Sequence, residues 1–226
     1  MRRAAIRLVV CLSILSCVSS IQAQLPAGWT SIDVGGPAAA GSAQYQAATD
    51  SWTIKGDGTG IMGTSDQFRY VYKELTGNGE LVARVASIDP PVTDYSMAGV
   101  MIRVVPNMAG SPFIFMGVSV NSDTRDHGVM LFYRTTVSGV ALVESTGTMT
   151  APYWVKVTRT GDTFAGSVSP DGKTWTEMGS DTAAGIPAKV YIGYAVTSNV
   201  GGKLVTAVFD KGPATASEPV PADKAI

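Results

Sequence analysis

The chain is poor in charge, histidine and cysteine, and each shortage excludes a class of protein. Charged residues make up 15% of its 226 residues, and there is one histidine, His127. Zinc sites built on histidines are excluded, because zinc requires several nitrogen or sulfur ligands. Both cysteines, Cys11 and Cys17, lie near the N-terminus. If that segment is removed, the mature chain has no disulfide and no metal bound by cysteine.

The first 23 residues have the layout of a secretory signal peptide. Met1-Arg2-Arg3 is basic, residues 4–18 are mostly apolar, and Ala23 is a small residue at the expected cleavage site. The apolar stretch is shorter than the roughly 20 residues that span a bilayer, so no membrane span is predicted. We expect a mature N-terminus near Gln24 and an extracytoplasmic location, periplasmic or extracellular. A lipoprotein anchored through Cys17 is the alternative, although Leu15 fits a lipidation signal poorly.

The charge balance of the mature chain argues against nucleic acid as a partner. Its 17 basic residues include Arg2, Arg3 and Arg7 of the leader, so 14 basic residues remain against 18 acidic ones. Binding to phosphate backbones favours a basic surplus.

Apolar residues recur with a period of two after the leader, and turn residues separate the runs. The expected strands are 29–33, 43–46, 51–55, 67–74, 80–86, 97–105, 112–120, 128–136, 153–160, 163–169, 173–178, 189–197 and 203–210. Many short strands with apolar residues on both faces predict two stacked antiparallel sheets. We expect one all-β domain over residues 24–210, with Leu81, Val100, Ile102, Ile114 and Val118 in its core. Residues 211–226 are rich in proline and alanine and predict a disordered tail.

Five segments together resemble a known domain of secreted bacterial proteins. They are residues 63–72 (GTSDQFRYVY), 77–85 (GNGELVARV), 98–103 (AGVMIR), 151–157 (APYWVKV) and 169–175 (SPDGKTW). In this order they resemble a domain of the concanavalin A-like lectin/glucanase superfamily that is often labelled "regulation of enolase protein"-like. The resemblance covers residues 29–210. It implies a concanavalin A/laminin G-like jelly-roll sandwich with a concave and a convex sheet, and it implies no established activity.

Catalytic patterns are missing from the sequence. Glycosidases need two carboxylates that flank the scissile bond, and on this sandwich one strand supplies them as Glu-x-Asp-x-Glu. None of the mature chain's glutamates has an acidic residue two positions away: Glu74, Glu80, Glu144, Glu177 and Glu218. Carboxylates from separate strands remain an alternative. His127 lies next to Asp126, but a catalytic triad needs a histidine held between an acid and a serine, so we expect a solvated loop histidine.

One loop carries candidate oxygen ligands for calcium. Asn121, Asp123 and Asp126 lie close together, and Ca²⁺ prefers carboxylate and carbonyl oxygens. Their spacing matches no defined calcium loop, so a polar turn is the alternative. No other cofactor is predicted.

Strand alternation also predicts a ligand-binding face opposite the core. Five aromatic and arginine side chains are expected on it: Arg84, Arg103, Phe115, Phe132 and Arg134. Aromatic rings stack on the apolar faces of sugars, and guanidinium groups donate paired hydrogen bonds. This prediction requires that the strands be neighbours in one sheet. The alternative is that loops cover the face and that the arginines pair with Glu80, Asp66 or Asp94.

The sequence therefore predicts a secreted, non-catalytic β-sandwich, either a carbohydrate-binding or an envelope or adhesion module. The expected partner is a glycan, and three arginines on one face would favour an acidic one. Two alternatives stay open: a glycoside hydrolase with carboxylates from separate strands, and a purely structural subunit that binds protein. The sequence makes no prediction about oligomeric state.

Overall fold

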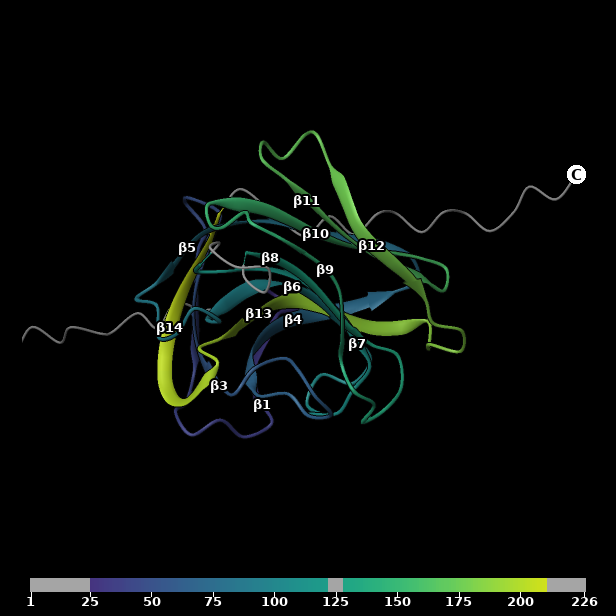
Figure 1. Ribbon diagram of the computed structural model, residues 1–226, viewed down its shortest axis with the longest axis horizontal. Coiled ribbons are helices and arrows are strands. Elements are labelled where there is room, and N and C mark those ends of the chain that lie inside the picture. The colour runs from purple at the N-terminus through teal and green to yellow at the C-terminus, as the bar shows by residue number, and fades with distance from the viewer. Residues whose placement is uncertain (1–24, 122–127, 211–226) are drawn as a thin grey trace, which may run out of the picture.

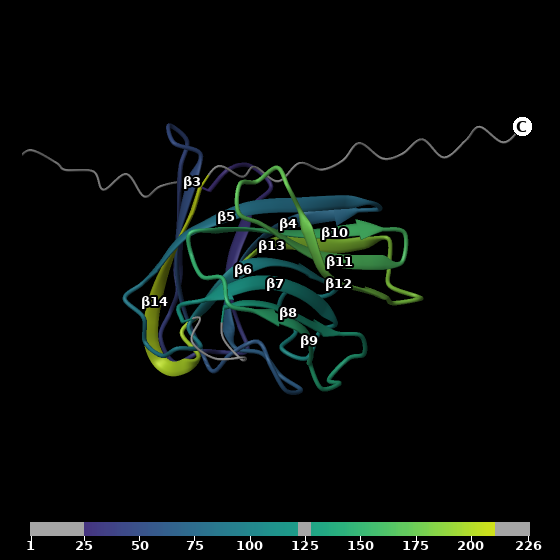
Figure 2. The ribbon, with the colours of Figure 1, turned by 45° about the horizontal axis from the view of Figure 1, so that its top comes forward.

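The computed structural model describes residues 25–121 and 128–210. Within them the chain forms fourteen strands and no helix, arranged as two antiparallel sheets that face each other (Figures 1 and 2). No described segment is a helix long and apolar enough to cross a membrane. The predicted leader, the predicted tail, Asp123, Asp126 and His127 lie outside the described residues.

Each sheet has seven strands. The first sheet has the order β1 (Thr30–Val34), β4 (Phe68–Thr76), β13 (Lys189–Thr197), β6 (Met97–Arg103), β7 (Phe113–Ser119), β8 (Val129–Arg134) and β9 (Leu142–Gly147). The second has the order β12 (Thr176–Thr182), β11 (Thr163–Ser169), β10 (Tyr153–Thr160), β5 (Gly79–Asp89), β14 (Val200–Asp210), β3 (Ser51–Gly58) and β2 (Ser42–Gln46). The predicted all-β, two-sheet antiparallel jelly roll is confirmed.

Most predicted strand ends shift by one to three residues, and two strands, β12 and β9, differ from the sequence prediction by more. β12 begins at Thr176 rather than at residue 173, because Asp171 holds the preceding segment as a turn. Its carboxylate accepts hydrogen bonds from the backbone amides of Lys173 and Thr174, both 2.8 Å long. β9 was not predicted at all. Its sequence does not alternate, and its pairing with β8 is interrupted between Leu131 and Phe132.

The space between the sheets is filled by one hydrophobic core. All five residues predicted for this core are buried in it: Leu81, Val100, Ile102, Ile114 and Val118. At one end of the core, the rings of Trp29, Tyr45, Trp52, Tyr194 and Phe209 pack against one another. Burial of each large apolar side chain contributes about 1.5–3 kcal/mol, which lets a domain of this size fold without disulfides.

The first sheet carries a second core on its outer face, the face turned away from the second sheet. Its buried members are Val34, Ile61, Phe68, Tyr70, Met97, Met101, Phe113, Phe115, Met130, Phe132 and Ala195. Three loops supply much of the cover: residues 59–67, 104–112 and 135–141. They bond to one another through the amide of Asp66 and the carbonyl of Ala109, and through the amide of Ala141 and the carbonyl of Gly63. The loops are therefore an ordered part of the fold that covers this second core.

A buried carboxylate, Asp57, ties the end of β3 to two other segments. It accepts hydrogen bonds from the backbone amides of Ala39 (2.6 Å), Gly58 (2.7 Å), Gly202 (3.0 Å) and Lys203 (3.2 Å). Burial raises the pKa of Asp57, but these four hydrogen bonds together outweigh burial and leave the pKa below its ordinary value.

This lowered pKa predicts acid-dependent stability. Ionised Asp57 stabilises the fold above the unfolded-state pKa, near 4, and the contribution is lost as the pH falls through the lower folded pKa. We expect Asp57→Asn to lower the free energy of unfolding by about 1–3 kcal/mol at pH 7 and to flatten its decline below about pH 4. Urea denaturation at pH 7, 5 and 3 measures the stability loss and its pH dependence. Asp94→Asn is the control, because Asp94 lies on the exposed surface. Equal pH profiles for the wild type and Asp57→Asn would contradict this role.

Candidate functional site

The structure places four of the five predicted ligand-binding residues on the outer face of the first sheet. Arg103 comes from β6, Phe115 from β7, and Phe132 and Arg134 from β8. The predicted placement of Arg84 on that face is wrong, because β5 belongs to the second sheet, where it pairs with β10 and β14. There the Arg84 guanidinium donates to both carboxylate oxygens of Asp210 at 2.7 and 2.9 Å.

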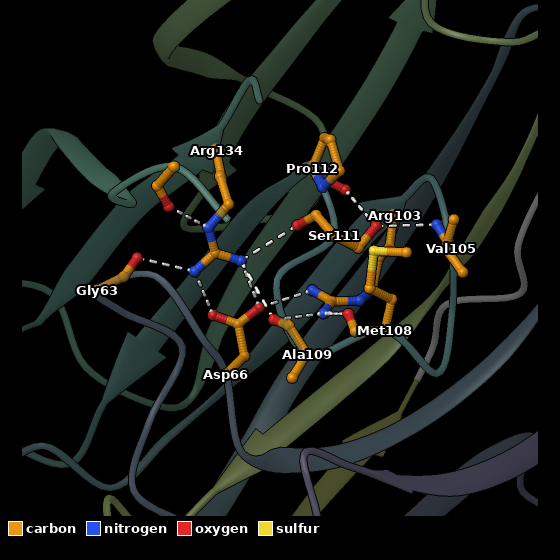
Figure 3. Close-up of polar contacts among 10 residues, drawn as sticks. Gly63, Asp66, Arg103, Val105, Met108, Ala109, Ser111, Pro112 and Arg134 are labelled. Carbon is orange, nitrogen blue, oxygen red and sulfur yellow. Dashed lines mark hydrogen bonds and ion pairs between the residues drawn. The ribbon is translucent and has the colours of Figure 1, made fainter. Parts of the chain in front are cut away.

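Arg103 and Arg134 converge on one carboxylate, Asp66 (Figure 3). Arg134 binds it through two nitrogens, with Nη1 2.7 Å from Oδ2 and Nη2 2.8 Å from Oδ1. Arg103 Nη1 lies 2.8 Å from Oδ2. All three charged groups are fully buried. We call these three residues the arginine–aspartate triad.

The triad also ties down the three covering loops. Its arginines donate to five backbone carbonyls, those of Gly63, Met108, Ala109, Ser111 and Gly139. Burial lowers the pKa of Arg103, and the charge and hydrogen bond of Asp66 oppose that shift. The guanidinium donors face protein groups rather than solvent. The expectation of an open arginine surface is thus corrected, and the pairing with Asp66 is the alternative that the sequence had raised.

The two predicted phenylalanines belong to the second core. Phe115 and Phe132 are both buried, and their rings stack with centroids 6.3 Å apart. The Phe115 ring lies over Gly117, where an added Cβ would stand 2.3 Å from its Cζ atom. The alternation therefore placed these rings on the correct face, but the covering loops close most of that face to solvent.

A groove on the same face stays open at the edge formed by β1, β4 and β13. It encloses about 550 Å³ and is lined by Gly28, Thr30, Tyr72, Lys73, Glu74, Pro106 and Tyr191. We call it the tyrosine groove. The rings of Tyr72 and Tyr191 meet edge to face, with centroids 5.4 Å apart and an interplanar angle of 88°. Tyr70 stacks on Tyr72 at 4.9 Å and so holds that ring in place.

Polar groups surround this ring pair. Glu74 forms an ion pair of 2.5 Å with Lys189, and both side chains are more than half exposed. The Lys189 ammonium lies 5.9 Å from the centre of the Tyr191 ring. Burial raises the pKa of Tyr72, so its hydroxyl stays neutral and can both donate and accept hydrogen bonds. Two aromatic rings, a neutral hydroxyl and the Glu74 carboxylate thus line one open groove, and the Lys189 ammonium lies beside it.

The sequence contained a partial signal for this groove. Tyr70 and Tyr72 alternate within the predicted strand 67–74, which places Tyr72 on the outer face. The sequence could not show that Tyr191 lies beside Tyr72, because that proximity depends on the pairing of β13 with β4 and β6.

A second groove lies diagonally across the same face. It encloses about 350 Å³ and is lined by Met62, Tyr95, Met97, Met130, Phe132, Val143 and Asn199. We call it the methionine groove. The two grooves lie toward opposite ends of the β6–β13 pair. Met97, in the methionine groove, is at the end where β6 pairs with Thr197, whereas Tyr191, in the tyrosine groove, is at the other end, where it pairs with Arg103. Of the five residues predicted to bind ligand, Phe132 is the one that lines either groove.

The calcium prediction is not tested by the structure. Asn121 follows β7, and its backbone carbonyl accepts a hydrogen bond of 3.1 Å from the Ser119 hydroxyl. Asp123 and Asp126 lie outside the described residues. Within the described part of the chain, no three histidine, cysteine or acidic side chains are grouped as a metal site.

Three solved structures share the architecture at low sequence identity. A functionally unknown protein from Saccharomyces cerevisiae is 18% identical with a TM-score of 0.62, over 84% of this chain and 97% of its own. The alginate lyase from Klebsiella pneumoniae is 12% identical with a TM-score of 0.50, over 84% and 95%. A GH43 protein from Bacillus licheniformis is 12% identical with a TM-score of 0.50, over 74% of this chain and 33% of its own. No protein-family model and no curated protein matches the sequence. At these identities the likeness establishes the fold.

Proposed function

We propose that this chain is a non-catalytic β-sandwich that binds a glycan in the tyrosine groove. The observation that carries the proposal is the Tyr72–Tyr191 ring pair, which lies in an open groove beside Glu74 and Lys189. Sugars present apolar C–H faces and a ring of hydroxyl groups. An aromatic ring packs against the C–H face, and charged or hydroxyl side chains form hydrogen bonds with the sugar hydroxyls.

The fold supports this choice of ligand class. One structural neighbour is named as an alginate lyase, so a protein of this architecture and similar extent is assigned to a polysaccharide. The leader-like first 23 residues suit a protein that meets glycans outside the cytoplasm. The expected preference for acidic sugars loses its basis, because Arg103 and Arg134 are buried and Arg84 lies on the other sheet.

The carboxylates favour binding over hydrolysis. Glycoside hydrolysis uses one carboxyl group as the acid and another as the base or nucleophile. Among the described residues that line the tyrosine groove, Glu74 is the single acidic side chain, and it is paired with Lys189. The glycoside hydrolase alternative would require a second carboxylate in reach of the same sugar.

Tyr191→Ala is expected to weaken glycan binding at least about tenfold. The variant loses contact with a ring whose burial is worth about 1.5–3 kcal/mol, and 1.4 kcal/mol corresponds to a factor of ten. Affinity electrophoresis through gels of neutral and uronate polysaccharides finds the ligand, and calorimetry then measures Kd. Tyr95→Ala is the matched control, because Tyr95 is a partly exposed tyrosine on the methionine groove.

The same experiment separates the alternatives. Equal losses of glycan affinity for Tyr191→Ala and Tyr95→Ala would show that the tyrosine groove is not the binding site. Release of new reducing ends from a bound polysaccharide would establish the hydrolase. If no polysaccharide retards the wild type, the structural subunit becomes the better explanation.

A further inference from the structure

Three methionine side chains from different parts of the chain line the methionine groove. Met62 comes from the loop 59–67, Met97 from β6 and Met130 from β8, and all three line the same space of about 350 Å³. Met62 is 46% exposed, whereas Met97 and Met130 are 1% and 3% exposed. The second core therefore holds the side chains of Met97 and Met130, and the side chain of Met62 is open to solvent.

One strand, β7, separates Met97 from Met130, and the residue of β7 that pairs with Met97 is Ser119. On β7, the residue paired with Met130 is Gly117, which in turn pairs with Gly99 of β6. The buried Phe115 ring lies over Gly117, beneath the groove, and Phe132, which stacks on Phe115, lines it. The described lining contains no charged side chain; its other members are Tyr95, Phe132, Val143 and Asn199.

Thioether sulfur is a neutral, soft ligand, and this chemistry selects the cation. Soft thiolate and thioether ligands prefer copper(I), whereas calcium, magnesium and manganese prefer carboxylate, carbonyl and water oxygens. The described lining residues include no acidic side chain, and among them no carboxylate neutralises an ion, which suits a single positive charge better than a double one. Aromatic rings beside the sulfurs add attraction for a cation.

We propose that Met62, Met97 and Met130 form a binding site for copper(I), with silver(I) as its redox-stable analogue. This site is independent of the tyrosine groove and of glycan binding. Thioethers do not titrate between pH 5 and 8, so affinity is the same at pH 5.5 and 7.5. A site built from histidine or cysteine would instead bind more weakly at the lower pH, because protons compete for those ligands.

Nuclear magnetic resonance of methyl-¹³C-methionine protein, titrated with silver(I), tests the site residue by residue. We expect shifts that saturate at one equivalent at the Met62, Met97 and Met130 methyl groups. The remaining methionines of the described residues serve as internal controls: Met101, Met108, Met116, Met149 and Met178. Competition with a copper(I)-specific chelator then gives the copper(I) affinity at the two pH values.

Met62→Leu tests the solvent-exposed ligand and conserves side-chain volume. It is expected to weaken silver(I) and copper(I) binding at least tenfold and to leave the fold intact. Met108→Leu is the matched control, because Met108 is 39% exposed but does not line the groove. Its metal affinity should equal that of the wild type. Equal, unsaturating shifts at Met62 and Met108, or no shift at Met97 and Met130, would overturn the site.

Discussion

Asp66→Asn is expected to lower the free energy of unfolding by about 3–5 kcal/mol, because removal of one partner leaves buried charge uncompensated. Asp66 is the carboxylate shared by Arg103 and Arg134, and no part of the triad reaches solvent. The substitution removes the negative charge and leaves two guanidinium groups buried side by side. Chemical denaturation at neutral pH measures the loss.

The matched control for this prediction is an ion pair of the same chemistry at the surface. Asp210→Asn breaks the ion pair with Arg84. The side chains of Asp210 and Arg84 are both 26% exposed. Exposed pairs contribute up to about 1 kcal/mol, so this variant should lose far less stability than Asp66→Asn. Equal losses for the two variants would mean that the triad does not hold the loops. High salt should weaken the Arg84 pair and leave the buried triad almost unaffected.

The same triad shows where sequence reasoning succeeded and where it stopped. Alternation within strands correctly placed Arg103 and Arg134 on one face with Phe115 and Phe132, since that pattern depends on neighbours two residues away. It could not show what covers the face. Asp66 is 37 residues from Arg103 and 68 from Arg134 along the chain, so their meeting is a property of the folded loops.

Sheet membership was the other limit. The ranges of β10, β11 and β13 agree with the prediction because turn residues bound them and alternation is regular inside them. Which sheet a strand joins depends on connections that cross the sandwich, and Arg84 was misplaced for that reason. The tyrosine groove has the same origin: Tyr72 and Tyr191 come together only when β13 inserts between β4 and β6.

Phe115→Ala is the second change with a large expected effect, a loss of about 3–5 kcal/mol of unfolding free energy. The ring is fully buried in the second core and stacks on Phe132, so truncation leaves a cavity that the surrounding strands cannot fill. A ring that served an open binding surface would instead weaken ligand binding and leave stability almost unchanged. Denaturation and calorimetry with the identified glycan, run on the same variant, distinguish the two roles.

Gly117 provides an internal check on this interpretation. A Cβ at this position would lie 2.3 Å from Cζ of Phe115 and 2.9 Å from the carbonyl oxygen of Ala98, so Gly117→Ala alone forces the ring to move. In the Phe115→Ala background the ring is gone and the closest of these contacts disappears. The double variant should therefore be more stable than the sum of the single losses predicts, by about 0.5–3 kcal/mol of coupling energy. Strict additivity would show that the Phe115 ring does not occupy the space above Gly117, and the second core would then need another arrangement.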